Sequence, residues 1–102
     1  MVWNAIGGPP LEEEFKFHQT RRWRADFYHP QSMALIEVEG GVFSGGRHNR
    51  ASGFLKDAEK YLEAALLGYR VIRLTSQQLN PETLKRLATY LLEIENLERE
   101  CI

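Results

Sequence analysis

Three stretches in the first 40 residues alternate between polar and apolar positions, which is the spacing of a β-strand. They cover 13–18, 22–28 and 33–39. In the second stretch one face carries Trp23, Ala25 and Phe27, and the other carries Arg22, Arg24, Asp26 and Tyr28. In the third, one face carries Ala34, Ile36 and Val38, and the other carries Met33, Leu35, Glu37 and Glu39. The segment HPQS between these two stretches predicts a turn, so the two strands are expected to form a hairpin.

The second half of the chain has helical spacing. A glycine-rich basic segment, GVFSGGRHNRASG, is expected to be a loop, after which Ser52 caps a helix over 53–67 that ends at Gly68. The apolar stripe expected on that helix comprises Phe54, Ala58, Tyr61, Leu62 and Ala65.

A strand over 69–75 and a last helix over 81–97 follow, the helix opening on Asn80 and Pro81. With a lead-in expected to be helical near 9–13, the order is lead-in, three strands, helix, strand, helix. This order predicts an α/β (α+β) fold in which helices flank a mixed sheet.

Composition places the chain among single-domain globular proteins. It has 102 residues, 43% of them hydrophobic and 26% charged, and one cysteine, which excludes an intrachain disulfide and a cysteine-based zinc site. No stretch has the length and apolarity of a membrane span, and the N-terminal segment lacks the layout of a signal peptide. A cytoplasmic location is therefore expected.

The net charge of −1 hides an uneven distribution. Residues 15–60 hold eight Lys or Arg side chains against five Asp or Glu, and three of those five acids are Asp26, Glu37 and Glu39. A small acidic cluster in basic surroundings suggests an anionic partner.

The period of two places Glu37 and Glu39 side by side, with Cα atoms about 7 Å apart. Asp26 reaches the same surface if the preceding strand pairs with theirs as a hairpin. Carboxylates that converge repel one another unless a hard cation lies between them, and oxygen ligands suit Mg²⁺ or Mn²⁺. The alternative is a solvated sheet face with Asp26 as an isolated acid.

Asp26, then ten residues, then Glu-x-Glu on an apolar strand, then a helix and the strand YRVIRLT, is an order that resembles the PD-(D/E)XK nuclease superfamily. More narrowly, it is similar to the small restriction-endonuclease-like proteins of phages and bacteria, near the VRR-NUC and very-short-patch-repair-like branches. The resemblance covers roughly 12–75. It implies an αβββαβ core, here followed by a C-terminal helix.

By position, the resemblance makes Asp26 and Glu37 the metal-binding carboxylates. Glu39 stands where most members have lysine, so it becomes a third metal ligand or a general base. Glu13 or a neighbouring acid corresponds to the first-helix glutamate, a further metal ligand.

Lys56 and Lys60 on the following helix are the candidates to replace the missing lysine. The alternative is that both belong to a solvated stripe with Glu59 and Glu63. The candidate contacts to DNA phosphates are Arg21, Arg22, Arg24, Arg47, His48 and Arg50.

The function expected from these residues is a Mg²⁺- or Mn²⁺-dependent endonuclease that hydrolyses DNA phosphodiester bonds, with structure-specific or nicking action or work in a larger complex as options. The alternatives are a non-catalytic nucleic-acid-binding module of the same fold and an interaction domain without a nucleic-acid partner. The last helix, with Leu92 and Leu97 beyond its stripe, either supports a homodimer or completes the core.

Overall fold

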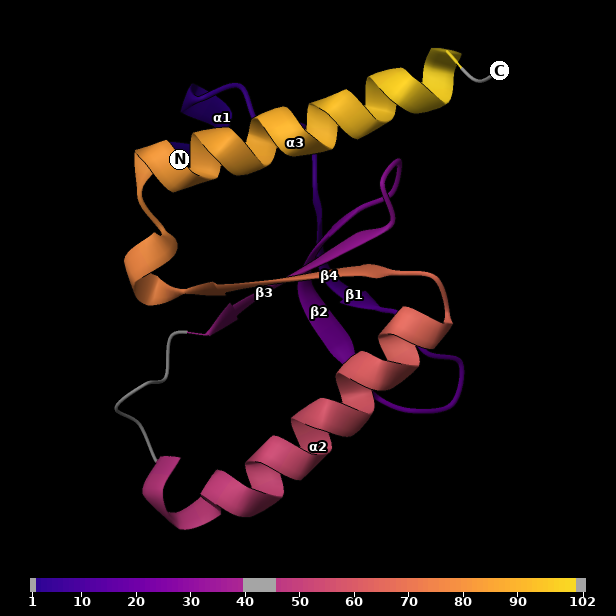
Figure 1. The fold of residues 1–102 in the computed structure, drawn as a ribbon, viewed down its shortest axis with the longest axis vertical. Helices are drawn as coiled ribbons and strands as arrows, with labels where there is room; N and C mark the ends of the chain where they lie inside the picture. Colours follow the sequence, from indigo (N-terminus) through magenta and orange to yellow (C-terminus); the bar gives the residue numbers. More distant parts are fainter. Residues whose placement is uncertain (1, 40–45, 101–102) are drawn as a thin grey trace.

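The computed structural model describes the backbone of residues 2–39 and 46–100, and within these it leaves undescribed the side chains of residues 46–52, 54, 99 and 100. The elements, in chain order, are α1 (Val2–Ala5), β1 (Glu12–Lys16), β2 (Arg24–His29), β3 (Ala34–Glu39), α2 (Gly46–Leu66), β4 (Arg70–Thr75), the 3₁₀ turn η1 (Ser76–Gln78) and α3 (Pro81–Glu100) (Figure 1). The general fold class is confirmed: an α+β arrangement with a mixed sheet.

The four strands follow one another in the order β1-β2-β3-β4. The pairs β1–β2 and β2–β3 are antiparallel, whereas β3 and β4 are parallel, because α2 carries the chain back across the sheet. The expected hairpin and the crossover through the helix are therefore both confirmed.

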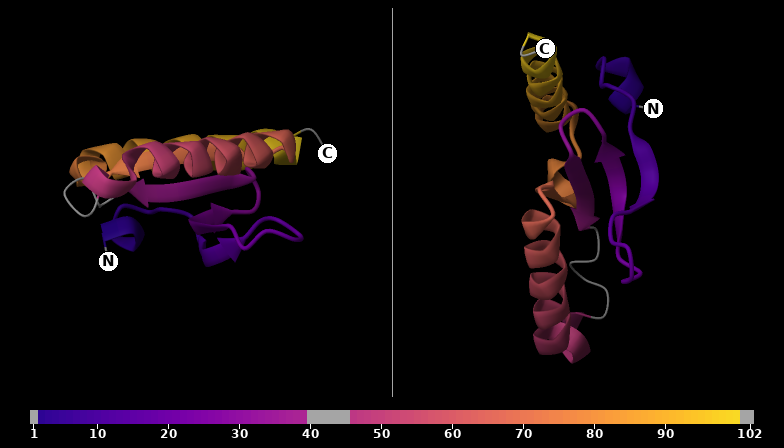
Figure 2. Two further views of the ribbon diagram at one scale, coloured as in Figure 1. Left: turned by 90° about the horizontal axis from the view of Figure 1, so that it is seen from below. Right: turned by 90° about the vertical axis from the view of Figure 1, so that its right-hand side faces the viewer.

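The two long helices lie on opposite sides of the sheet (Figures 1 and 2). Ala64 of α2 packs into one core cluster with Ala25 and Leu35, whereas Leu91 of α3 packs into the other with Ala34 and Ile36. The alternation predicted for β3 is thus confirmed, since Leu35 faces α2 while Ala34 and Ile36 face α3. Glu37 and Glu39 continue the α2 side.

The faces predicted for β2 are wrong in part. Ala25 packs with Tyr28 on the α2 side, whereas Phe27 packs on the α3 side. The regular ladder of β1 with β2 skips the position of Glu14, whose φ of 50° lies in the left-handed region. The change of face between Ala25 and Phe27 lies opposite this residue in the ladder, and a strict period of two does not anticipate it.

Helix α2 begins earlier than expected. It starts at Gly46 and not near residue 53, so residues 46–52 of the expected loop are helical, and residues 40–45 lie outside the described residues. No proline interrupts residues 46–53, and arginine and alanine favour helix. The helix ends as predicted at Gly68, whose φ is 95° and whose N–H donates to the carbonyl of Ala65.

The face of α2 that packs on the sheet also differs from the predicted stripe. Lys60 and Ala64 face inward, and Leu62 of the predicted stripe is exposed. The sheet and its connections supply the large side chains of this layer, among them Phe17, Leu35 and Val71, so α2 contributes only the small Ala64 there and pairs Lys60 with Glu37.

The lead-in is not helical near 9–13. Strand β1 begins at Glu12, and the short helix α1 lies earlier, at Val2–Ala5. Pro9 and Pro10 disfavour a helix because the residue before each proline is driven to extended backbone. Trp3 instead anchors α1 by donating its indole N–H to the carbonyl of Pro9 at 2.8 Å.

Helix α3 starts as predicted, with the Asn80 side chain accepting from the N–H of Thr83 at 2.8 Å. Its far half is tied to the β2–β3 turn by a buried polar cluster. His29 Nε2 lies 2.7 Å from a carboxylate oxygen of Glu95, and His29 Nδ1 lies 2.7 Å from the hydroxyl of Ser32. The imidazole is fully buried, and this cluster fixes α3 against the sheet.

Candidate functional site

The site begins where β2 and β3 stop pairing through their backbones. The ladder runs from His29–Ala34 to Phe27–Ile36 and ends there. Beyond it the Asp26 carboxylate bridges the strands, because its Oδ2 accepts a hydrogen bond from the N–H of Val38 at 2.7 Å. This contact holds an acid alongside β3, where its charge acts on Glu37.

Glu37 forms the centre of the site together with Lys60 of α2. Lys60 Nζ donates to Glu37 Oε1 at 2.6 Å, and the two side chains are only 17% and 12% exposed. Burial raises the pKa of Glu37, the hydrogen bond and charge of Lys60 oppose that rise, and the negative charges of Asp26 and Asp57 add to it. Asp26 and Glu37 thus interact electrostatically, and Lys60 stabilises the ionised form of the Glu37 carboxylate.

Glu39 lies one pleat further along and pairs with Arg73 of β4. The Arg73 guanidinium lies 4.5 Å from the ring centre of Tyr61, so the aromatic ring holds it in place. Burial raises the pKa of Tyr61 to about 12, with the charge of Glu37 as the next cause, which keeps the phenol protonated.

Sequence reasoning missed Arg73 and Tyr61. The parallel register of β3 and β4 places Arg73 opposite Glu37 and within reach of Glu39. The sequence signal was present in the second arginine of the strand RVIRLT, which is flanked by apolar residues, but its partner becomes evident only once the order of the strands is known.

The structure places three carboxylates and two cations along one stretch of β3 and its neighbours. The carboxylates belong to Asp26, Glu37 and Glu39, and the cations to Lys60 and Arg73. Within the described part of the chain, no three metal-ligating side chains lie close enough to share one ion, so the expected convergence of all three carboxylates is not seen there.

Glu13 is not part of this arrangement. It lies in β1, opposite Phe27, and is exposed, so its expected place in a first helix is wrong. The two prolines before β1 keep this segment extended, as described above. Lys56 is likewise exposed on α2, one turn before Lys60.

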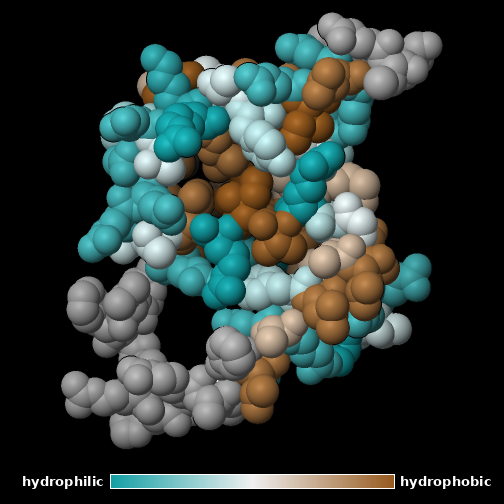
Figure 3. Space-filling view, viewed as in Figure 1, coloured by the Kyte–Doolittle hydropathy of each residue, from teal (hydrophilic) through white to brown (hydrophobic). Residues whose placement is uncertain are grey.

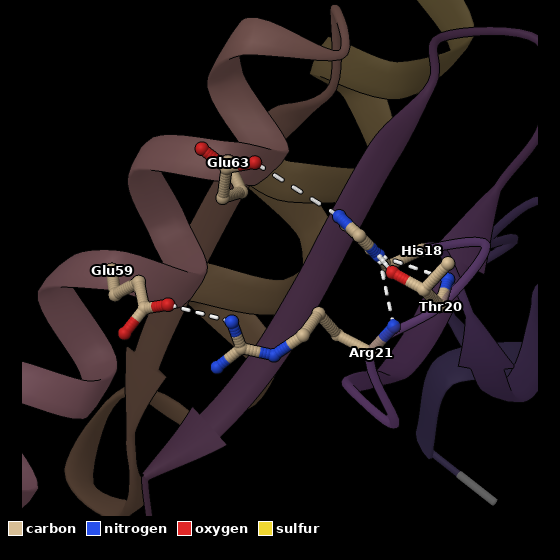
Figure 4. A network of polar contacts seen from close by, with 5 residues as sticks. All are labelled: His18, Thr20, Arg21, Glu59 and Glu63. Carbon is tan, nitrogen blue, oxygen red and sulfur yellow. Dashed lines mark hydrogen bonds and ion pairs between the residues drawn. The ribbon is translucent and has the colours of Figure 1, made fainter.

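Arg21 is held by a network that joins the β1–β2 connection to α2 (Figure 4). Its guanidinium donates to Glu59 at 2.7 Å and lies 4.2 Å from the ring centre of Trp23. The imidazole Nδ1 of His18 accepts from the backbone N–H groups of Thr20 and Arg21, which orders the turn. This turn presents Arg21 half-exposed beside the helix.

The other basic candidates lie apart. Arg24 lies 3.5 Å from Glu14, and Arg22 is exposed. The backbones of Arg47, His48 and Arg50 lie in the first turns of α2, and their side chains are outside the described residues.

The donor chemistry of the site fits a hard divalent cation at Asp26 and Glu37. Both supply carboxylate oxygens from adjacent strands, and the contacts described above use one oxygen of each. The carboxylates and cations named above carry a net charge of −1, which is compatible with a divalent ion there. Glu39 fits as a further ligand only when Arg73 releases it.

Comparison with known proteins gives no assignment: no protein-family model, curated protein or solved structure matches this chain. Among the helices of residues 2–39 and 46–100, none combines the length and apolarity needed to cross a membrane.

Proposed function

We propose that this protein is a Mg²⁺- or Mn²⁺-dependent nuclease that hydrolyses phosphodiester bonds in DNA. The observation that carries the proposal is the 2.6 Å contact between Lys60 and the half-buried Glu37, beside Asp26 at the point where β2 and β3 separate. Two acids and a lysine from three elements form the set that metal-assisted phosphodiester hydrolysis needs.

Each of these residues has a distinct role in the proposed reaction. Asp26 and Glu37 would hold the metal, which would supply an activated water and neutralise charge on the phosphate. Lys60, on the helix, replaces the lysine that the resemblance places at Glu39, and its ammonium stabilises negative charge on the reacting phosphate. Glu39 and Arg73 flank this set, with Glu39 as a third ligand or general base.

DNA is the proposed partner because exposed arginines lie on the β1–β2 connection, where Arg21 contacts α2, the helix that carries Lys60. Arg21 and Arg22 are exposed on the β1–β2 connection. Such residues fix the position of the phosphate backbone without reading sequence. A domain of this size has little room for a separate part that reads sequence. Structure-specific or nicking action, or work within a larger complex, is therefore the proposed mode of action.

The second candidate is a nucleic-acid-binding module without catalysis. The ion pairs of Glu37 with Lys60 and Glu39 with Arg73 favour it, because they satisfy both acids without a metal. A protein of this kind binds DNA in a salt-sensitive way and does not cut it.

The test is cleavage of supercoiled plasmid in Mg²⁺ and in Mn²⁺. Asp26→Asn keeps an acceptor for the Val38 N–H, Glu37→Gln keeps the shape of the side chain, and Lys60→Met removes only the charge. All three are expected to lose cleavage at least about 100-fold, as is typical when a catalytic group is removed. Lys56→Met, one turn away, is the matched control and is expected to retain it.

Circular dichroism shows that each variant folds, and a gel-shift assay separates the candidates. DNA binding without cleavage by the wild-type protein identifies the binding module. Equal cleavage by wild type, Asp26→Asn and Glu37→Gln contradicts the site assignment. Loss of cleavage in Lys56→Met but not in Lys60→Met would show that Lys56, and not Lys60, is the lysine that acts in the reaction.

A further inference from the structure

The ion pair of Arg73 with Glu39 lies open to solvent, unlike the pair of Lys60 with Glu37 beside it. The Arg73 and Glu39 side chains are 45% and 39% exposed, about three times the exposure of the other pair. On the side of the molecule seen in Figure 3, hydrophilic surface lies beside the apolar surface over β4. Exposed ion pairs are weak because water competes for both charges. A new partner can therefore replace either member of the Arg73–Glu39 pair.

The ring of Tyr61 holds the Arg73 guanidinium at the site independently of Glu39. The guanidinium carbon lies 4.5 Å from the ring centre, and Lys60 Nζ lies 5.5 Å from the centre of the same ring. A cation is attracted to the face of an aromatic ring without any counter-ion. Arg73 therefore stays beside Lys60 when Glu39 turns away from it.

The position of Arg73 in its strand places it closer to the centre of the site than its ion pair suggests. The parallel register sets Arg73 opposite Glu37, so its side chain reaches one pleat further along the sheet to contact Glu39. Residues paired across neighbouring strands point to the same face of the sheet. A guanidinium released from Glu39 is thus next to Glu37 and Lys60, and its planar set of N–H donors matches the oxygens of a phosphate.

Asp57 of α2 also acts on Arg73 through its charge, as it does on Glu37. It is exposed, so solvent screens this attraction more than the direct contact with Glu39. Acids therefore hold Arg73 while DNA is absent, and Glu39 is the acid that a phosphate has to displace.

We propose that Arg73 binds a phosphate of the DNA at this site, and that it exchanges Glu39 for that phosphate when Glu39 turns to the metal. Tyr61 is the positioning residue that holds the guanidinium in both states. The inference rests on the proposed nuclease function and adds a phosphate-binding residue to it. Because Glu39 is available to a metal only when Arg73 leaves it, metal and DNA each increase the affinity of the protein for the other.

The first experiment measures Mn²⁺ binding by titration calorimetry without DNA. Arg73→Gln is expected to bind Mn²⁺ about five-fold more tightly than wild type, because Glu39 then has no competing cation. Arg70→Gln is the matched control, since Arg70 is exposed in the same strand but donates to the carbonyl of Ser32 at the other end of β4. It is expected to bind Mn²⁺ as wild type does, and circular dichroism shows that each variant is folded.

The second experiment measures the affinity for a fluorescently labelled DNA duplex by anisotropy, with and without Ca²⁺. Ca²⁺ also prefers oxygen ligands, and gel electrophoresis of the same samples confirms that the DNA stays intact. With Ca²⁺ present, Arg73→Gln is expected to bind DNA about ten-fold more weakly than wild type, because a charge-assisted contact to phosphate is lost. Without Ca²⁺ the two proteins are expected to differ little, because Arg73 is then engaged by Glu39.

The third experiment separates the ring of Tyr61 from its hydroxyl. Tyr61→Phe keeps the ring and is expected to bind DNA in Ca²⁺ as wild type does. Tyr61→Leu removes the ring and is expected to weaken this binding several-fold and to raise KM for plasmid cleavage in Mn²⁺ while kcat changes little. Equal losses in both variants would overturn the positioning role of the ring.

The results distinguish this inference from the nuclease function. A wild-type protein that cuts DNA, with Arg73→Gln and Arg70→Gln alike in Mn²⁺ and DNA binding, overturns the inference and leaves the proposed function intact. Tighter Mn²⁺ binding by Arg73→Gln with unchanged DNA affinity overturns the phosphate contact. A wild-type protein that binds Mn²⁺ but never cuts DNA overturns the nuclease function, and the two binding measurements still decide whether Arg73 exchanges its partner.

Discussion

Replacing Lys60 by methionine tests how much the ion pair at the candidate site contributes to the stability of the fold. Methionine keeps most of the length of the side chain, so the layer between α2 and β3 stays filled, but the charge opposite Glu37 is lost. Exposed ion pairs contribute roughly 0–1 kcal/mol, whereas breaking a buried pair costs about 3–5 kcal/mol. With side chains that are 17% and 12% exposed, the Lys60–Glu37 pair lies between these limits.

We therefore expect Lys60→Met to lower the free energy of unfolding by about 2 kcal/mol at pH 7, which in a domain of this size lowers Tm by roughly 10 °C. Urea unfolding followed by circular dichroism measures the change. Lys56→Met removes an exposed charge from the same helix and is expected to change stability by less than about 0.5 kcal/mol.

The pH dependence of this loss has a defined sign. Burial raises the pKa of Glu37 in the folded state, and Lys60 opposes the rise, so the variant has a still higher pKa. A carboxyl whose folded pKa is raised holds its proton more tightly when folded, so stability falls as pH rises from the unfolded pKa to the folded one. The difference between Lys60→Met and wild type is therefore largest at neutral pH and shrinks as the solution is acidified through that window.

A second substitution distinguishes the effect of losing the ion pair from a general destabilisation of the helix. Glu37→Gln in the Lys60→Met background removes the unpaired buried charge, so the double variant is expected to be more stable than Lys60→Met alone at pH 7. Equal losses for Lys60→Met and Lys56→Met, or a loss that does not change with pH, would refute the reasoning.

Two further predictions concern the backbone and the α3 anchor. Gly68→Ala is expected to destabilise the fold by about 1 kcal/mol because φ is 95° there. Gly53→Ala, inside α2 and with open space for the added Cβ, should stabilise it by about 0.5–1 kcal/mol. Urea unfolding measures both, and the same sign for both would contradict the argument. Glu95→Ala leaves the buried Nε2 of His29 without its partner and is expected to lower the free energy of unfolding by about 1–3 kcal/mol, while Glu93→Ala on the exposed side of α3 should change it little. Thermal unfolding of the two variants tests this. Equal Tm values would exclude a stabilising role for the buried cluster.

Most of the helices and strands could be predicted from the sequence because the residues that form or end them do so through their own local preferences. Gly68 and the pair Asn80 and Pro81 mark helix ends through their own backbone preferences, and the structure follows them. The alternation in β3 correctly placed Leu35 on the face opposite Ala34 and Ile36.

The site was harder to predict from the sequence because its contacts join residues that are far apart in the chain. The sequence identified Asp26 and Glu37 and included Lys60 among two candidates, but helical periodicity assigned both lysines to the solvent side. The inward face of α2 is decided by the sheet that it covers, where Glu37 offers a lysine a better partner than water does. The face switch between Ala25 and Phe27 lies opposite Glu14, whose φ of 50° is in the left-handed region, and no pattern in β2 reveals it.

The crossover through α2 has a consequence for the order in which the protein folds. Glu37 and Lys60 are separated by 23 residues, and Glu39 and Arg73 by 34, so neither pair forms within the β2–β3 hairpin. Closing a segment of that length costs entropy before its contacts contribute, and parallel pairing of this kind is slow. A nascent chain that has folded only its first three strands therefore carries its acids without their cations, and it acquires the complete constellation only in the step that adds the last strand.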